Sequence, residues 1–168
     1  MTVNIKSGLA KWLRSVGLPG LAVMVSSLAS SAASSAVLAQ DGLIGFIKTV
    51  TPETSVLIDG KPLRAQAGMP LQAGFVVKTG PVGTLGMTLR DNTILSFGPN
   101  SEFVIDEYLY APNKGALKLS ATLFKGSMQY ISGIIAKLKP DAVSVKFPGG
   151  VVGVRGTEFL LLVEDDKS

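Results

Sequence analysis

The 168 residues of this chain give room for one domain with a real core, since 46% of them are apolar. The absence of cysteine and histidine excludes a disulfide framework, a thiolate nucleophile, and histidine as a general base or metal ligand. Three of the 16 cations and none of the 12 acids lie in the first 39 residues, so the remainder has no basic excess that would indicate nucleic-acid binding.

Residues 1–39 carry the three-part pattern of a signal peptide. A cationic start ends at Arg14, an apolar stretch covers residues 16–28, and a region rich in serine and alanine follows. Val37 and Ala39 are small enough for the −3 and −1 pockets of signal peptidase, so we predict a helical signal peptide that is cleaved after Ala39. The protein would then contact the membrane only transiently, during export.

A retained N-terminal anchor is the alternative for this segment. Pro19 and Gly20 interrupt the apolar stretch and serines follow Val25, so the stretch falls short of the roughly 20 apolar residues of a stable span. The export pattern predicts a bacterial protein of the periplasm or the extracellular space.

After Gly42 the apolar residues alternate with small or polar ones. The alternation runs through residues 85–89, 117–123 and 143–147. Successive side chains of a strand point to opposite faces, so each run predicts a strand with one apolar face. This pattern suits sheets that are covered on one side.

Turn sequences separate these runs at short intervals. They lie at Asp59-Gly60, Asp91-Asn92, Gly98–Ser101, Pro112–Gly115 and Pro148–Gly150. Many short strands with this spacing predict an all-β fold, either a sandwich, an antiparallel roll or a short β-helix. We assign residues 40–163 to this one β domain and residues 164–168 to a solvated acidic tail. Ile131–Lys139 is too short for its periodicity to separate a helix from a loop.

Four segments carry recognisable motifs in a fixed order: Gly68–Gly80, Gly83–Ser101, Lys125–Met128 and Val151–Phe159. In turn, they resemble a turn leading into a G-D-x-V-x-T-G-like strand, an L-x-L-x-D-G-T-x-L-x-L-x-P-x-S run, a K-G strand start and an R-G-T-x-F ending. Motifs of this kind in this order are similar to those of the FecR family. The resemblance covers residues 68–161 and is carried by the order and spacing of the motifs.

The chain departs from the family's pattern in three respects. Asn92 stands where glycine is usual after the aspartate, a mild change because asparagine also accepts left-handed backbone. Ala73-Gly74-Phe75 lacks the acidic residue common after the glycine, so no role of that acid carries over. Full-length FecR regulators join a cytosolic anti-sigma region, a transmembrane helix and a periplasmic sensing domain. We expect this chain to lack the first two, so the resemblance implies only an exported interaction or sensing module.

Asp106, Tyr108 and Tyr110 form the first candidate binding surface. Tyrosine is enriched in interfaces, so two carboxylates and two rings in Asp106–Tyr110 predict a lip that contacts a partner. The alternative is a strand that leaves the core with its tyrosines packed on one face.

Arg155 and Glu158 form the second candidate surface. Their side chains offer a contact for a partner or ligand. The alternative is structural: a turn at Gly156, a Thr157 hydroxyl that bonds nearby backbone, and an arginine–carboxylate pair closing the last strand.

No group of residues predicts catalysis, a metal site or a cofactor. The adjacent acids Asp106 and Glu107 are expected on opposite faces of a strand, which does not make a hydrolytic pair. We therefore predict a non-enzymatic interaction or regulatory module that binds an envelope protein or ligand. The alternatives are an envelope- or carbohydrate-active enzyme that uses a carboxylate such as Asp106 or Glu158, and a purely structural envelope protein.

Overall fold

The computed structural model describes residues 42–154 and 158–164. The predicted signal peptide and its predicted cleavage site lie outside these residues, as does the tail beyond residue 164. Twelve strands and three short helices occupy the described part. In chain order they are β1 (Leu43–Val50), β2 (Thr54–Ile58), β3 (Lys61–Arg64), β4 (Pro70–Gln72), β5 (Val76–Thr79), β6 (Leu85–Leu89), β7 (Ile94–Phe97), β8 (Glu102–Ala111), η1 (Pro112–Lys114), β9 (Ala116–Ile131), α1 (Ile134–Leu138), η2 (Pro140–Ala142), β10 (Val143–Phe147), β11 (Gly150–Gly153) and β12 (Glu158–Val163).

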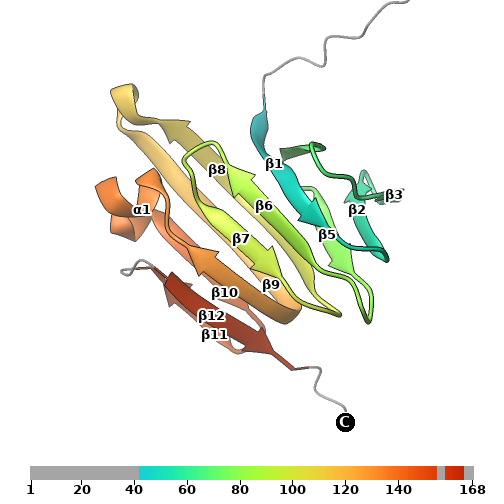
Figure 1. Ribbon diagram of the computed structural model, residues 1–168. Coiled ribbons are helices and arrows are strands. Elements are labelled where there is room, and N and C mark those ends of the chain that lie inside the picture. Colours follow the sequence, from blue (N-terminus) through green and yellow to red (C-terminus); the bar gives the residue numbers. More distant parts are fainter. Residues whose placement is uncertain (1–41, 155–157, 165–168) are drawn as a thin grey trace, which may run out of the picture. The chain divides into compact units, whose positions relative to one another are not determined.

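The strands form one twelve-stranded sheet built around β9 (Figure 1). The first part of this 16-residue strand pairs with β8 and β10, and its second part pairs with β7 and β12. β9 therefore belongs to two halves of the sheet. The first half has the order β4-β1-β6-β7-β9-β12, and the second has the order β3-β2-β5-β8-β9-β10-β11. The pairing is antiparallel throughout the described strands except between β10 and β9.

β9 passes from one half to the other at Gly126. This residue has a φ of +87°, and a Cβ atom there would stand 2.4 Å from the Cα atom of Ser101. The Ser101 hydroxyl holds the bend, because it accepts the N–H of Ser127 at 3.0 Å and lies 2.9 Å from the carbonyl oxygen of Gly98. The Ser101 N–H in turn donates a hydrogen bond to the Thr79 hydroxyl at 2.8 Å. Ser101, part of the proline-x-serine motif, is thus a structural residue.

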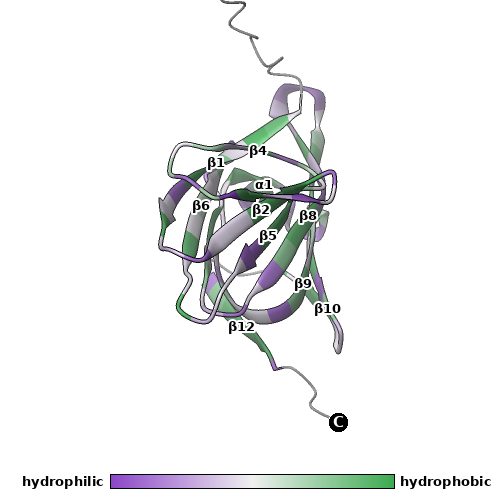
Figure 2. Ribbon diagram, turned by 90° about the vertical axis from the view of Figure 1, so that its right-hand side faces the viewer, coloured by the Kyte–Doolittle hydropathy of each residue, from purple (hydrophilic) through white to green (hydrophobic). Residues whose placement is uncertain are grey.

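The predicted alternation matches the observed burial. Leu85, Met87 and Leu89 are almost completely buried, whereas Gly86 and Thr88 between them are only half-buried. Figure 2 shows apolar and polar positions alternating along the strands as the two halves curl over the core. Burial of apolar surface at roughly 25 cal/mol per Å² is the main force that holds this small sheet together.

The predicted all-β antiparallel roll is confirmed. Asp59 and Gly60 both have positive φ angles and join β2 to β3 by a two-residue turn. The ambiguous segment Ile131–Lys139 contains the short helix α1. Within the described residues, no helix combines the length and the apolar character needed to cross a membrane.

Candidate functional site

Asp91 is a fully buried carboxylate in the turn between β6 and β7. Asn92 takes a φ of +65° here, and the Leu89 N–H reaches the carbonyl oxygen of Thr93 at 2.9 Å, closing the turn. The Asp91 side chain points inward and has an exposed fraction of 0%. A buried carboxylate is costly unless hydrogen bonds compensate for the lost water.

Four hydrogen bonds provide that compensation. Oδ1 of Asp91 accepts the Thr93 N–H at 3.3 Å and the Tyr108 hydroxyl at 3.2 Å. Oδ2 accepts the Thr93 hydroxyl at 2.7 Å and the Ile135 N–H at 3.3 Å. Two carboxylate oxygens offer about four lone pairs, so this side chain is saturated and has no acceptor left for a substrate or metal.

The same cluster holds the loop between β9 and α1 against the sheet. The Ile134 N–H donates to the Asp91 carbonyl oxygen at 2.7 Å, and the Gly133 N–H donates to the Thr93 hydroxyl at 3.2 Å. A Cβ atom at Gly133 would stand 2.3 Å from the Asp91 carbonyl oxygen, so only glycine allows this approach. The cluster therefore connects three segments that are far apart in the chain.

Two tyrosines flank the cluster, and their hydroxyl groups differ in hydrogen bonding. The Tyr108 hydroxyl also accepts the Asp91 N–H at 3.0 Å; burial, followed by the charge of Asp91, raises the pKa of Tyr108 well above its usual range. Tyr130 is fully buried and its hydroxyl makes no hydrogen bond within the described structure. Burial raises the pKa of Tyr130 to about 12. The polar side chain of Thr93 acts to lower this pKa, and the charge of Asp91 acts to raise it.

The prediction that Asp106 and Glu107 lie on opposite faces of a strand is wrong, because β8 has a bulge at Asp106. Ile105 faces Ala121 on β9 whereas Glu107 faces Ser120, so Asp106 is an extra residue in the strand. A β-bulge shifts the alternation by one position. Both acids are consequently exposed on the outward face of the sheet.

Each of these two acids has partners on neighbouring strands. Asp106 accepts the Thr122 hydroxyl at 2.8 Å and lies 3.8 Å from Nζ of Lys146, while Glu107 pairs with Lys118 at 3.0 Å. These contacts account for both carboxylates as surface links between β8, β9 and β10.

The structure describes four of the five predicted contact residues and does not bring these four together. Asp106 faces solvent, but Tyr108 is turned inward to Asp91 and Tyr110 packs against the core. Glu158 begins β12 in the other half of the sheet, where its carboxylate accepts a hydrogen bond from Gln129. Arg155 lies outside the described residues. Asp106 and Glu158, the two carboxylates named for the enzyme alternative, lie on strands β8 and β12 in different halves of the sheet.

Sequence reasoning missed the role of Asp91. The sequence indicates only that Asp91-Asn92 lies in a turn and that Asp91-Asn92-Thr93 is part of the family motif. The spacing of an aspartate two residues before a threonine is the signal that could have indicated a side chain folding back on its own turn. In the described part of the chain, no group of three or more acidic, histidine or cysteine side chains could hold a metal ion.

The fold and this cluster define an all-β module whose polar centre is structural. The family model described as FecR protein matches residues 75–168, more than half of the chain, so the protein belongs to the FecR family. This is a family of regulatory and signalling domains. No curated protein and no solved structure gives a significant match.

Proposed function

We propose that the protein is an exported regulatory module that binds a protein partner or ligand in the bacterial cell envelope. The observation that supports this proposal most is membership of the FecR family, because that family consists of regulatory and signalling domains. The N-terminal pattern of cations, apolar residues and small residues supports export to the periplasm or the extracellular space.

The organisation of the polar groups is consistent with a binding role. The buried carboxylate of Asp91 is used entirely inside the fold, while the outward acids Asp106 and Glu107 are tied to neighbouring strands. The described surface offers strand edges, exposed apolar side chains such as Leu160, and exposed cations such as Lys48 and Lys61 to a partner.

Cross-linking in intact cells followed by mass spectrometry tests the proposal. We expect one or a few envelope proteins to be cross-linked repeatedly to residues after position 40. A variant that lacks residues 2–39 is the matched control, because it should remain in the cytoplasm and lose those cross-links. Recovery of no defined partner, or of the same proteins with the control, would count decisively against the proposal. N-terminal sequencing of the exported protein tests cleavage after Ala39.

A further inference from the structure

We propose that the free edge of β12 binds an extended segment of a partner protein, apolar in its middle and carrying Lys or Arg at its ends. The proposal rests on the proposed function and specifies where and how the partner binds. β12 pairs with β9 over six residues, and Phe159 stacks on Tyr130 with ring centroids 5.0 Å apart. In the described part of the chain no strand pairs with the other side of β12.

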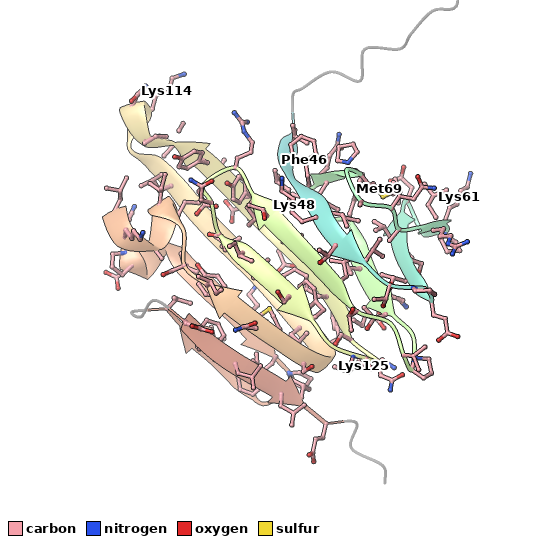
Figure 3. The ribbon with its side chains drawn as sticks, in the orientation of Figure 1. Phe46, Lys48, Lys61, Met69, Lys114 and Lys125 are labelled. Atoms are coloured by element: carbon pink, nitrogen blue, oxygen red, sulfur yellow. The ribbon has the colours of Figure 1, made fainter. Side chains whose placement is uncertain are left out.

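The other edge strands carry features that discourage strand addition, and β12 does not. β3 has the sequence KPLR, and Lys61 projects from it in Figure 3. β4 has three residues and begins with proline, and β11 has four residues, two of them glycine. Proline, cations and short length all disfavour pairing at an edge. β12 has six residues, EFLLLV, without proline, glycine or cation.

The exposed side chains of β12 indicate what would pair with it. Leu160 and Leu162 are 73% and 63% exposed, whereas Phe159, Leu161 and Val163 are half-buried against the core. An added strand would place one row of side chains beside the two exposed leucines and the other row beside the half-buried residues. A segment that is apolar on both faces therefore fits this edge better than an alternating one.

The acidic residues at the two ends of β12 indicate which residues the partner's segment carries at its own ends. Glu158 and Glu164, which are both exposed, bracket the apolar run. Lys125, the described cation nearest in strand register, precedes Gly126 on β9 and so lies on the paired side of β12 (Figure 3). Cations at the ends of an added strand would be attracted to both acids. A second copy that adds through its own β12 would instead set Glu158 opposite Glu164, and like charges placed opposite each other are unfavourable.

Binding of a synthetic probe tests this directly. The protein is purified from the cells that express it, and fluorescence anisotropy follows a labelled peptide, Lys-Lys-Val-Leu-Val-Leu-Val-Lys-Lys. We expect saturable binding that weakens about ten-fold when glutamate replaces every lysine, because attraction at both ends becomes repulsion. Methylation of alternate backbone nitrogens should abolish binding, since strand addition needs the peptide N–H groups.

Protein variants locate the site. Leu162→Lys places a cation on the edge and should weaken binding of the lysine peptide at least about ten-fold. Leu63→Lys, at an exposed leucine of β3, is the matched control and should bind the peptide as the wild type does. Absence of binding, equal binding of the methylated peptide, or no effect of Leu162→Lys would overturn the proposal. So would dimerisation in sedimentation velocity that Leu162→Lys removes, because the edge would then serve a second copy.

The two proposals fail in different ways. If cross-linked envelope partners are retained by Leu162→Lys cells and the peptide does not bind, the regulatory module stands and the β12 site is wrong. If no envelope partner is found at all, the proposed function itself fails.

Discussion

The hydroxyl of Tyr108 is hydrogen-bonded to Asp91 twice, donating to Oδ1 at 3.2 Å and accepting the backbone N–H at 3.0 Å. Tyr108 belongs to β8 in one half of the sheet, whereas Asp91 follows β6 in the other half. The same carboxylate receives the N–H of Ile135 at the start of α1. One buried side chain thus joins both halves of the roll and its helix.

We expect Asp91→Asn to lower the free energy of unfolding by roughly 3 kcal/mol. Each carboxylate oxygen accepts two donors, so an amide NH2 group in either orientation would face two N–H or O–H groups. Urea unfolding followed by circular dichroism measures the change. Asp106→Asn is the control, because this exposed side chain has one hydrogen bond and should change stability by about 0.5 kcal/mol or less. Equal stability of the two variants would show that the Asp91 cluster is not a structural connection.

Half-buried Tyr108 and fully buried Tyr130 should respond differently to loss of the hydroxyl. Tyr108→Phe leaves the Asp91 N–H without a partner and should destabilise the fold by about 1–3 kcal/mol. Tyr130→Phe removes a buried hydroxyl that makes no hydrogen bond and should be neutral or stabilise by up to about 1 kcal/mol. The ring contacts are kept in both variants, so the difference between their urea midpoints isolates the hydroxyl groups. Destabilisation by Tyr130→Phe equal to that by Tyr108→Phe would contradict the assignment.

Local pattern predicts the strands of this protein well but does not predict the Asp91 cluster. Residues 85–89 alternate in sequence and in burial, and Asp59-Gly60 has the composition of the turn that it forms. The partners of Asp91 lie 17 positions away at Tyr108 and 44 positions away at Ile135. Only the tertiary arrangement brings these donors to the turn, so no local pattern indicates that Asp91 is buried.

Two further features could not be read from local sequence. The bulge at Asp106 shifts the alternation of β8, and adjacent acids carry no signal for an extra residue. The run Phe159–Val163 is apolar throughout, which is typical of a strand covered on both faces. The structure covers one face and leaves Leu160 and Leu162 exposed, because β12 lies at the edge of the sheet.

Gly126 should be among the least replaceable residues of the sheet. Alanine there must adopt a φ of +87°, and its Cβ atom would meet Ser101 at 2.3–2.7 Å. We expect Gly126→Ala to destabilise the fold by more than about 2 kcal/mol, from backbone strain and overpacking together. Gly115→Ala is the control: its φ is +66°, but no atom lies within 4 Å of the new Cβ, so about 1 kcal/mol is expected. Similar losses in the two variants, measured by thermal unfolding, would mean that the close approach at Ser101 is unimportant.

Stability should fall as the pH rises above about 10, and Tyr108 and Tyr130 should account for part of the fall. The folded protein holds their phenolic protons more tightly than the unfolded chain does, because burial raises the pKa of Tyr108 and raises that of Tyr130 to about 12. The contribution is complete below the unfolded pKa near 10 and is lost as the pH passes through the folded values, since the unfolded chain ionises first.

Urea unfolding of the wild type, Tyr108→Phe and Tyr130→Phe between about pH 9 and pH 11 measures the effect. Contributions of all other side chains are common to the three proteins and cancel in the comparison. Each variant should therefore lose stability less steeply than the wild type, whereas parallel curves would show that neither phenol is held in its neutral form by the fold.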